Sequence, residues 1–272
     1  MKEDWEDYWE EPEEIKRDYK IDEAKEELQN FFKEKKKNVF YMKQLEVKYE
    51  KQFFHWIIAR AINELIDEGV LGYEMVPLRD ATRVKFVFNR RHRYYKRQIN
   101  RCLEVIKEYS NQNVAKACGR QAEVLFLNAL AIKGFMPKGE NINEYKGQKW
   151  SRTNHDLDFI IERDEISYGC EVKNTFDYIE YDELDVKLNM CDFLRVKPLF
   201  IMRGSPKTYN YEIIKRGGFA LIFETQIYPF GYRELVNRIR EVLKMPVDCP
   251  NAIPEGIVKR FINWHEKQLC EF

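Results

Sequence analysis

Residues 154–174 read NHDLDFIIERDEISYGCEVKN, in which two runs with apolar residues at alternate positions flank the charged tetrapeptide ERDE. This pattern predicts two antiparallel strands joined by a tight turn. If the turn is centred in the middle of the tetrapeptide, Asp158 lies opposite Glu171, and directly opposed side chains share a face with their Cβ atoms about 5 Å apart. Lys173 comes two residues after Glu171 and is expected on that same face. Four apolar side chains are expected on the other face, in a core: Leu157, Phe159, Cys170 and Val172.

The facing carboxylates of Asp158 and Glu171 repel each other by roughly 3 kcal/mol at about 5 Å and an effective dielectric constant of about 20. A chain that places them so must screen them with a lysine, protonate one of them or bind a cation. A pair of hard oxygen ligands beside a lysine suits Mg²⁺ or Mn²⁺. The pattern alone leaves open an exposed hairpin with ordinary mixed charges.

Charge is distributed unevenly along the chain of 272 residues. Hydrophobic residues make up 44% and charged residues 34%, so the chain can form two modest domains with densely ionic surfaces. The formal net charge of +0 hides an acidic start, with thirteen acids and five bases from Met1 to Glu27, and a basic middle, with nine bases and one acid from Arg79 to Arg101. Residues 1–21 are expected to form an acidic tail, and the basic run is a candidate surface for a polyanion.

The composition argues against several classes of protein. The six cysteines form no Cys-x-x-Cys pair and the four histidines have no partner spacing, which argues against a zinc site. Scattered single cysteines are typical of the reducing cytosol, and no apolar run approaches the length of a membrane span. We therefore expect a cytoplasmic protein without a membrane partner.

Residues 22–93 are expected to form a first domain of three helices followed by a two-stranded ribbon. Asp22 is the expected N-cap of the first helix. The third helix, over about residues 52–68, carries an apolar stripe and is expected to end at Gly69 in the left-handed conformation. The two strands of the ribbon are expected on either side of a break at residues 77–81.

This order of elements resembles a winged helix-turn-helix domain. The resemblance implies that the third helix enters the major groove of DNA and that the ribbon contacts the phosphate backbone. Cations follow the ribbon, interleaved with Tyr94 and Tyr95. The candidate nucleic-acid contacts are Arg79, Arg83, Lys85, Arg90, Arg91, Arg93, Lys96 and Arg97. The third helix also carries Glu64, Asp67 and Glu68, and many winged helices bind proteins instead, so a protein partner stays open.

Residues 94–113 are expected to form a connecting helix, and residues 114–248 a second domain. In this domain the predicted helices alternate with short buried strands, which indicates an α/β sandwich around a mixed sheet. A strongly apolar helix is expected to open at Gly119. Residues 249–272 are expected to form a C-terminal helix that packs on a domain or on a second subunit.

Charged residues in the second domain follow a recognisable order. The apolar helix carries Gly119 and Glu123 in the spacing Gly-x-x-x-Glu, and a strand carrying Asp158 follows. Glu171 and Lys173 then form Glu-x-Lys on the next strand, before a further helix and strand. This order resembles the PD-(D/E)xK nuclease superfamily, which has the restriction-endonuclease-like fold. Within it, the pattern is most similar to archaeal Holliday-junction resolvases and methylation-dependent restriction enzymes.

The resemblance implies a chemistry for these residues. It makes four of them catalytic: Glu123, Asp158, Glu171 and Lys173. It implies that Mg²⁺ or Mn²⁺ is held by Asp158, Glu171 and the main-chain carbonyl of Val172. It further implies a metal-dependent endonuclease that hydrolyses phosphodiester bonds of DNA, with branched or modified DNA among the substrates and a homodimer as the assembly.

The sequence departs from the family at Leu157, where many members have proline. Asp156 is a second candidate for the acidic residue of this strand, but Asp158 is preferred because it faces Glu171 and begins an apolar run. Asp156 is expected to be a solvated turn residue, and Lys187 is expected on a solvated helix face. A catalytically inactive, nuclease-like protein that binds DNA or acts as a scaffold is the alternative that stays open.

Overall fold

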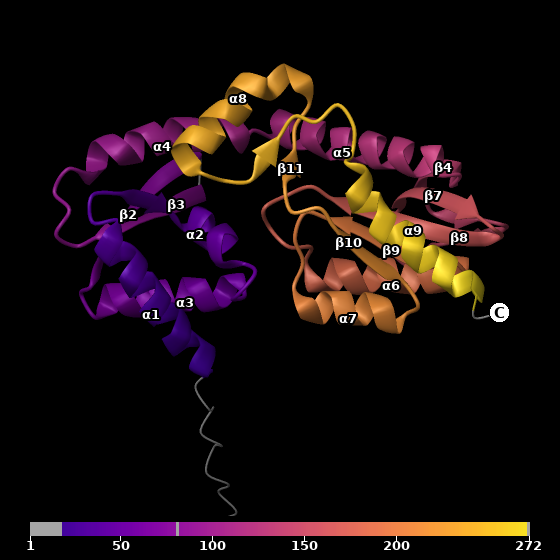
Figure 1. The fold of residues 1–272 in the computed structure, drawn as a ribbon, viewed down its shortest axis with the longest axis horizontal. Helices are drawn as coiled ribbons and strands as arrows, with labels where there is room; N and C mark the ends of the chain where they lie inside the picture. The colour runs from indigo at the N-terminus through magenta and orange to yellow at the C-terminus, as the bar shows by residue number, and fades with distance from the viewer. Residues whose placement is uncertain (1–17, 80–81, 271–272) are drawn as a thin grey trace, which may run out of the picture. The chain divides into compact units, whose positions relative to one another are not determined.

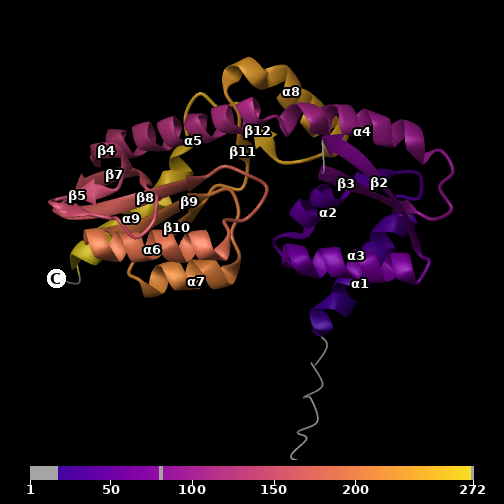
Figure 2. The same cartoon turned by 180° about the vertical axis from the view of Figure 1, so that it is seen from behind.

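The computed structural model describes residues 18–79 and 82–270, and the chain divides into two compact units (Figures 1 and 2). The first unit holds the residues up to Glu74 together with residues 85–95, and the second holds residues 75–84 and everything from Lys96. Residues 1–17, most of the expected acidic tail, and residues 80–81, in the expected turn of the ribbon, lie outside the described residues. Within the described parts of the chain, no helix is both long enough and apolar enough to cross a membrane.

The first unit packs three helices against a small antiparallel sheet. Its elements are α1 (Tyr19–Glu34), β1 (Val39–Tyr41), α2 (Met42–Tyr49), α3 (His55–Asp67) and parts of β2 (Leu71–Arg79) and β3 (Thr82–Asn89). Residues 71–74 of β2 and 85–89 of β3 belong to this unit, and the remainder of the two strands belongs to the second unit. The strands lie in the order β1-β3-β2, so β2 is an edge strand. The core is built from the apolar stripes of the helices, which contribute Leu28, Phe32, Leu45, Ile58, Ile62 and Leu65.

Two predictions for this unit are wrong and one is confirmed. Helix α1 begins earlier than expected, because Asp18 rather than Asp22 is its N-cap and accepts a hydrogen bond from the Lys20 main-chain N–H at 3.0 Å. Pro77 does not break the ribbon but lies inside β2, where an edge strand tolerates a residue without an N–H group. Gly69 follows α3 with a φ of 73°, as the helix-ending glycine was expected to do.

Two long helices open the second unit. Helix α4 (Tyr95–Tyr109) is followed by α5 (Gln112–Ile132), and Asn111 caps α5 by accepting a hydrogen bond from the main-chain N–H of Asn113 at 2.9 Å. The expected opening at Gly119 is wrong by about two turns, because the Asn111 cap starts the helix upstream and Gly119 lies in its interior.

A mixed five-stranded sheet forms the centre of the second unit. Its strands are β4 (Met136–Ile142), β7 (Leu157–Arg163), β8 (Ile166–Lys173), β9 (Lys197–Met202) and β10 (Phe219–Ile222), and they lie in the order β10-β9-β8-β7-β4. Neighbours from β4 to β8 are antiparallel, and β8, β9 and β10 are parallel. Two short pairs lie outside this sheet: β5 (Glu144–Tyr145) with β6 (Gln148–Lys149), and β11 (Gln226–Ile227) with β12 (Val247–Asp248).

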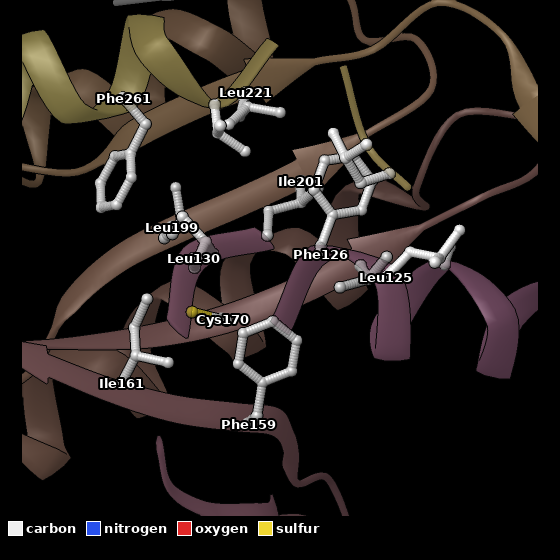
Figure 3. Packing of buried hydrophobic residues seen from close by; sticks show 14 of the residues in the cluster. Leu125, Phe126, Leu130, Phe159, Ile161, Cys170, Leu199, Ile201, Leu221 and Phe261 are labelled. Atoms are coloured by element: carbon white, nitrogen blue, oxygen red, sulfur yellow. The ribbon is translucent and has the colours of Figure 1, made fainter. Parts of the chain in front are cut away.

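Helices cover both faces of this sheet. The remaining ones are α6 (Tyr181–Leu194), α7 (Lys207–Lys215), the 3₁₀ turn η1 (Phe230–Tyr232), α8 (Arg233–Arg238), its π-helical continuation η2 (Ile239–Leu243) and α9 (Glu255–Cys270). One face packs on α5 and α9, through Phe126 of α5 and Phe261 of α9 (Figure 3). The other face packs on α6 and α7, through residues such as Leu188 and Ile213. The expected α/β sandwich is therefore present, and the C-terminal helix packs on its own domain.

The β7–β8 hairpin has the predicted register. Its pairs run from Arg163 with Ile166 to Phe159 with Cys170, and the next pair in this register is Asp158 with Glu171. The turn residues Asp164 and Glu165 both have positive φ, 52° and 63°, which suits the right-handed twist of a two-residue hairpin.

Of the four apolar side chains expected on the core face away from Glu171, three lie there: Phe159, Cys170 and Val172. Leu157 was predicted wrongly. It packs with Ile160, Met190 and Cys191 on the α6 side, because the side-chain alternation of β7 is interrupted where the strand begins.

Gly169 in the middle of β8 allows the close approach of α6. A Cβ atom at this position would lie 2.7 Å from a methyl carbon of Leu157, 2.8 Å from one of Val196 and 3.0 Å from Cys191 Sγ. We predict that Gly169→Ala destabilises the protein by about 1–3 kcal/mol, because three packed side chains would have to move.

Gly119→Ala is the matched control. It makes the same chemical change inside α5, where a Cβ atom meets no heavy atom within 4 Å. It should stabilise the protein by about 0.5–1 kcal/mol through helix propensity. Urea unfolding of both variants measures the difference, and a Gly169→Ala protein as stable as the wild type would contradict the close packing of α6 on β8.

Candidate functional site

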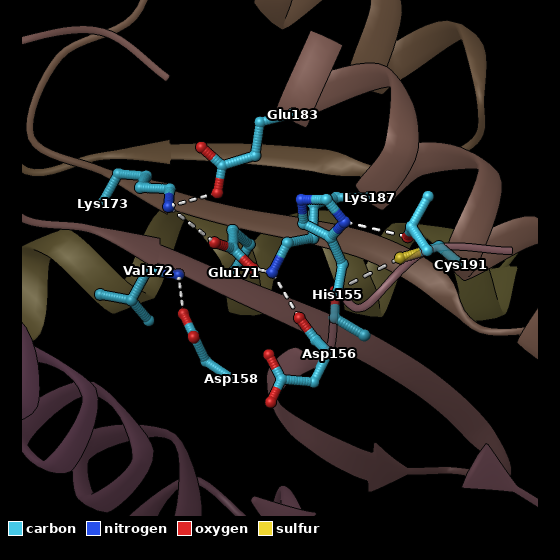
Figure 4. Close-up of polar contacts among 11 residues, drawn as sticks. His155, Asp156, Asp158, Glu171, Val172, Lys173, Glu183, Lys187 and Cys191 are labelled. Atoms are coloured by element: carbon cyan, nitrogen blue, oxygen red, sulfur yellow. Dashed lines mark hydrogen bonds and ion pairs between the residues drawn. The ribbon is translucent and has the colours of Figure 1, made fainter. Parts of the chain in front are cut away.

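Asp158 lies at the start of β7, where its side chain, rather than its main chain, bonds to the main chain of β8. Its Oδ2 accepts a hydrogen bond of 2.6 Å from the main-chain N–H of Val172 in β8 (Figure 4). The other carboxylate oxygen accepts no hydrogen bond from the described residues. Burial, followed by the charge of Glu171, raises the pKa of Asp158 to about 7, and the Val172 N–H and Lys187 only partly oppose this. The Asp158 carboxyl group is therefore poised between its neutral and charged forms at neutral pH.

Glu171 is 2% exposed and uses both carboxylate oxygens in ion pairs. Its Oε1 lies 3.1 Å from Lys173 Nζ, and its Oε2 lies 2.5 Å from Lys187 Nζ. A buried carboxylate is costly unless it is paired and hydrogen-bonded, and the two lysines supply both. Facing carboxylates can be screened by a lysine, protonated or bound to a cation. Glu171 is screened by lysines.

Lys173 joins Glu171 to the following helix. Its Nζ lies 2.7 Å from Oε1 of Glu183, which is in the first turn of α6. Burial lowers the pKa of Lys173, but Glu171 and Glu183 outweigh burial and hold this pKa above its usual range. Lys173 is therefore a fixed positive charge in this arrangement. A neutral amine that could accept a proton would require the loss of these two carboxylate partners.

Lys187 was predicted wrongly as a solvated residue. It is 4% exposed, and its amino group lies between Oε2 of Glu171 and the main-chain oxygen of Asp156, to both of which it donates (Figure 4). Asp156 itself has an exposed side chain, as expected. The sequence holds one signal for Lys187: it follows Glu183 by four residues, so both side chains lie on the same face of α6.

Glu123 lies at the margin of this group. It is on α5 and its carboxylate lies 3.1 Å from Arg120 Nη1, which also lies 2.6 Å from Glu140 of β4. Its charge still raises the pKa of Asp158, as the weakest of the named causes. The structure thus brings Asp158, Glu171 and Lys173 together and ties Glu123 to an arginine beside them.

The oxygen donors fit a hard cation in kind but are few. Among residues 18–79 and 82–270, no group of three or more His, Cys, Asp or Glu side chains is arranged to hold a metal ion. The donors at the hairpin are the carboxylates of Asp158 and Glu171 and the main-chain carbonyl of Val172. Mg²⁺ commonly takes one or two carboxylates and keeps several waters, so this set suits it. A metal on Glu171 would have to displace one of the two lysines.

The candidate nucleic-acid contacts are distributed over both units. Seven are exposed, and Lys85 is half-buried with its Nζ 2.7 Å from Asn63 Oδ1 of α3. Lys85, Arg90, Arg91 and Arg93 belong to the first unit. The other four belong to the second unit: Arg79, Arg83, Lys96 and Arg97. Arg79 donates to the main-chain oxygen of Lys107 at 3.0 Å.

Comparison with models of protein families, with curated proteins and with solved structures finds no match to this chain.

The raised pKa of Asp158 predicts a pH-dependent stability. The folded protein binds this proton more tightly than the unfolded chain, so the contribution to stability is present at low pH and is lost as the pH rises through about 7. Asp158→Asn has no such loss and can still accept the Val172 N–H. We expect its free energy of unfolding relative to wild type to rise by at most about 3 kcal/mol between pH 5 and pH 8.

Urea unfolding in EDTA at the two pH values measures this change. Asp156→Asn, an exposed carboxylate two residues away, should show no such trend. If the difference between Asp158→Asn and wild type is the same at both pH values, the carboxyl group of Asp158 does not titrate between them.

The buried ion pair of Lys187 predicts a second effect. Lys187→Met keeps an apolar stem as long as that of lysine but removes the amino group, which leaves Oε2 of Glu171 without its partner. We expect a loss of about 3 kcal/mol in the free energy of unfolding. Lys116→Met, on the exposed side of α5, is the matched control and should change stability by less than about 0.5 kcal/mol. Equal stability of the two variants would mean that Lys187 is solvated after all.

Proposed function

We propose that this protein is a metal-dependent endonuclease that hydrolyses DNA, with a PD-(D/E)xK type of site on the β7–β8 hairpin. One observation carries the proposal. Asp158 and Glu171 repel each other strongly enough to help raise the pKa of Asp158 to about 7, and Lys173 lies beside them. Such a carboxylate pair favours the uptake of a cation, which is the chemistry that the nuclease family uses.

The fold of each unit supports this proposal. A mixed sheet with helices on both faces, and an acidic residue on the helix before it, agrees with a restriction-endonuclease-like domain. In the first unit, three helices are followed by an antiparallel ribbon that β1 extends, which agrees with a winged helix-turn-helix domain. We infer that the first unit recruits DNA and that the second cuts it.

Asp158, Glu171 and the main-chain carbonyl of Val172 would hold Mg²⁺ or Mn²⁺. Such an ion, when bound, polarises a phosphate and lowers the pKa of its bound water. The fixed positive charge of Lys173 would stabilise the negative charge that develops on the phosphate, and Glu183 would orient Lys173 for this role. Lys187 would hold the Glu171 carboxylate in position from the α6 side.

The contacts to DNA would come from the exposed cations of the basic run. Contacts to phosphates do not depend on the base sequence, so these cations would bind many DNA sequences. Their binding would weaken as the salt concentration rises. Cutting both strands of a duplex requires two active sites, and we infer a homodimer for that reason. The resemblance to junction resolvases favours branched or modified DNA as a substrate.

A catalytically inactive DNA-binding protein is the second candidate. It is favoured by the occupied oxygens of Glu171, since both already bind lysines. It is also favoured by the lack of a third acidic side chain in the donor set among the described residues. Such a protein would use the same surfaces without cutting.

Cleavage assays test the proposal. The wild-type protein should cut at least one member of a panel of single-stranded, duplex, methylated, flap and four-way-junction DNA in Mg²⁺ or Mn²⁺. Asp158→Ala and Lys173→Ala should each reduce the rate by at least about 100-fold, because they remove a metal ligand and the charge at the phosphate. Asp156→Ala, the neighbouring carboxylate with an exposed side chain, should retain the activity.

A protein that cuts no member of this panel with either metal refutes the nuclease. If DNA binding also survives Asp158→Ala and is lost after charge reversal at Arg90, Arg91 and Arg93, the inactive DNA-binding protein is the correct description.

A further inference from the structure

A basic hollow of about 820 Å³ lies on the surface of the first unit. Three segments line it: Lys33 near the end of α1 with Lys36 and Lys37 just after it, the turn of Gly69 and Val70 after α3, and residues 89–94 at and after the end of β3. This volume is in the range of pockets that bind small molecules or a few units of a polymer.

The turn after α3 brings these segments together. Val70 donates a main-chain hydrogen bond of 2.9 Å to Leu65 of α3, and Arg90 donates one of 3.4 Å to Val70. The positive φ of Gly69, 73°, closes this turn against Arg90. A Cβ atom at Gly69 would lie 2.4 Å from Nη1, at the flexible end of the Arg90 side chain, so the positive φ rather than this contact is what favours glycine here.

The lining of the basic hollow is strongly cationic. It holds six lysines and arginines, namely Lys33, Lys36, Lys37, Arg90, Arg91 and Arg93, and among the described residues it includes no Asp or Glu. Like charges gathered in a concavity repel one another and raise the local positive potential. A ligand that relieves this repulsion carries several negative charges in a row.

The adjacent residues Tyr94 and Tyr95 have different surroundings. Tyr95 stacks on Phe88, with ring centroids 4.1 Å apart and an angle of 13° between the planes. Tyr94 lines the basic hollow, is 83% exposed and stacks on no aromatic ring within the described part of the chain. Its ring is available to a ligand, and an aromatic ring beside cations is the combination that binds single-stranded nucleic acid.

We infer that the basic hollow binds a single-stranded segment of nucleic acid, with phosphates on the lysines and arginines and a base stacked on Tyr94. An intact duplex keeps the faces of its bases inside its own stack, so it offers none to Tyr94. The inference rests on the proposal that the protein acts on DNA, and it makes DNA with a single-stranded segment the preferred substrate.

The basic hollow is separate from the far end of the ribbon. It lies where β2 begins, next to Val70, and where β3 ends, at Asn89. β2 ends at Arg79 and β3 begins at Thr82, so these residues lie at the opposite end of the two strands. Binding of a single strand in the basic hollow can therefore be changed without changing duplex contacts at Arg79 and Arg83, which makes the inference testable.

Fluorescence anisotropy of the full chain with labelled (dT)8 and a blunt duplex, in EDTA, tests the inference. Tyr94→Ala should weaken (dT)8 binding about tenfold, and Tyr94→Phe should not, because the stacking ring is retained. Lys36→Glu should weaken it at least threefold more than Lys35→Glu. These two neighbours, just after α1, are both exposed, but only Lys36 lines the basic hollow. Duplex affinity should change less than twofold in Tyr94→Ala.

Three results would overturn the inference. The first is (dT)8 affinity that Tyr94→Ala leaves unchanged, or no (dT)8 binding at any salt between 50 and 300 mM. The second is an equal loss of (dT)8 and duplex affinity in Tyr94→Ala, which would describe a general phosphate-binding surface. The third is competition by dTMP as strong as that by (dT)8, which would identify a free nucleotide as the ligand.

The cleavage panel separates this inference from the nuclease proposal. Binding of (dT)8 that depends on Tyr94 in a protein that cuts nothing would retain the basic hollow and reject the nuclease. Cleavage that is lost in Asp158→Ala, in a protein whose (dT)8 affinity is unchanged by Tyr94→Ala, would retain the nuclease and reject the single-strand site.

Discussion

The charge balance around Glu171 is the constraint on which the second unit depends. This carboxylate is buried in β8, the central strand of the sheet, where an unpaired charge is costly, and it pairs with Lys173 on its own strand and Lys187 on α6. Lys187 can reach it because Gly169 lets α6 lie close to β8. The position of α6, the geometry of the hairpin and the ionisation of the site therefore depend on one another.

The same balance explains why the second carboxylate titrates near neutral pH. Three carboxylates, those of Glu171, Glu183 and Asp158, face the two lysines Lys173 and Lys187. With Asp158 protonated the charges are even, and ionisation of Asp158 leaves one negative charge in excess in a largely buried place. A proton and a cation are alternative ways to remove that excess, so in the proposed nuclease the uptake of a metal would release the proton of Asp158.

Local pattern was sufficient to predict the hairpin, and packing between distant segments explains the failures. Alternation and turn chemistry gave the register of the hairpin from Arg163 with Ile166 to Phe159 with Cys170, because both depend only on residues close in sequence. Lys187 could not be placed in this way, since a lysine is solvated by default and its burial depends on the approach of α6 to β8. Pro77 likewise reads as a break unless the strand order is known, because proline is acceptable in β2 only at the edge of the sheet.

The basic run shows why charge along a sequence does not by itself define a binding surface. Its residues follow one another from Arg79 to Arg101, yet the fold assigns some to the first unit and others to the second. The concavity that gathers Arg90, Arg91 and Arg93 also includes Lys36 and Lys37, which follow α1 more than 50 residues upstream. The sequence does not distinguish Tyr94 from Tyr95, because they are the same residue type at adjacent positions. In the structure, Tyr95 stacks on Phe88 and Tyr94 faces solvent. In the proposed single-strand site, this exposed ring among six cations would stack on a base while the cations bind the phosphates on either side of it.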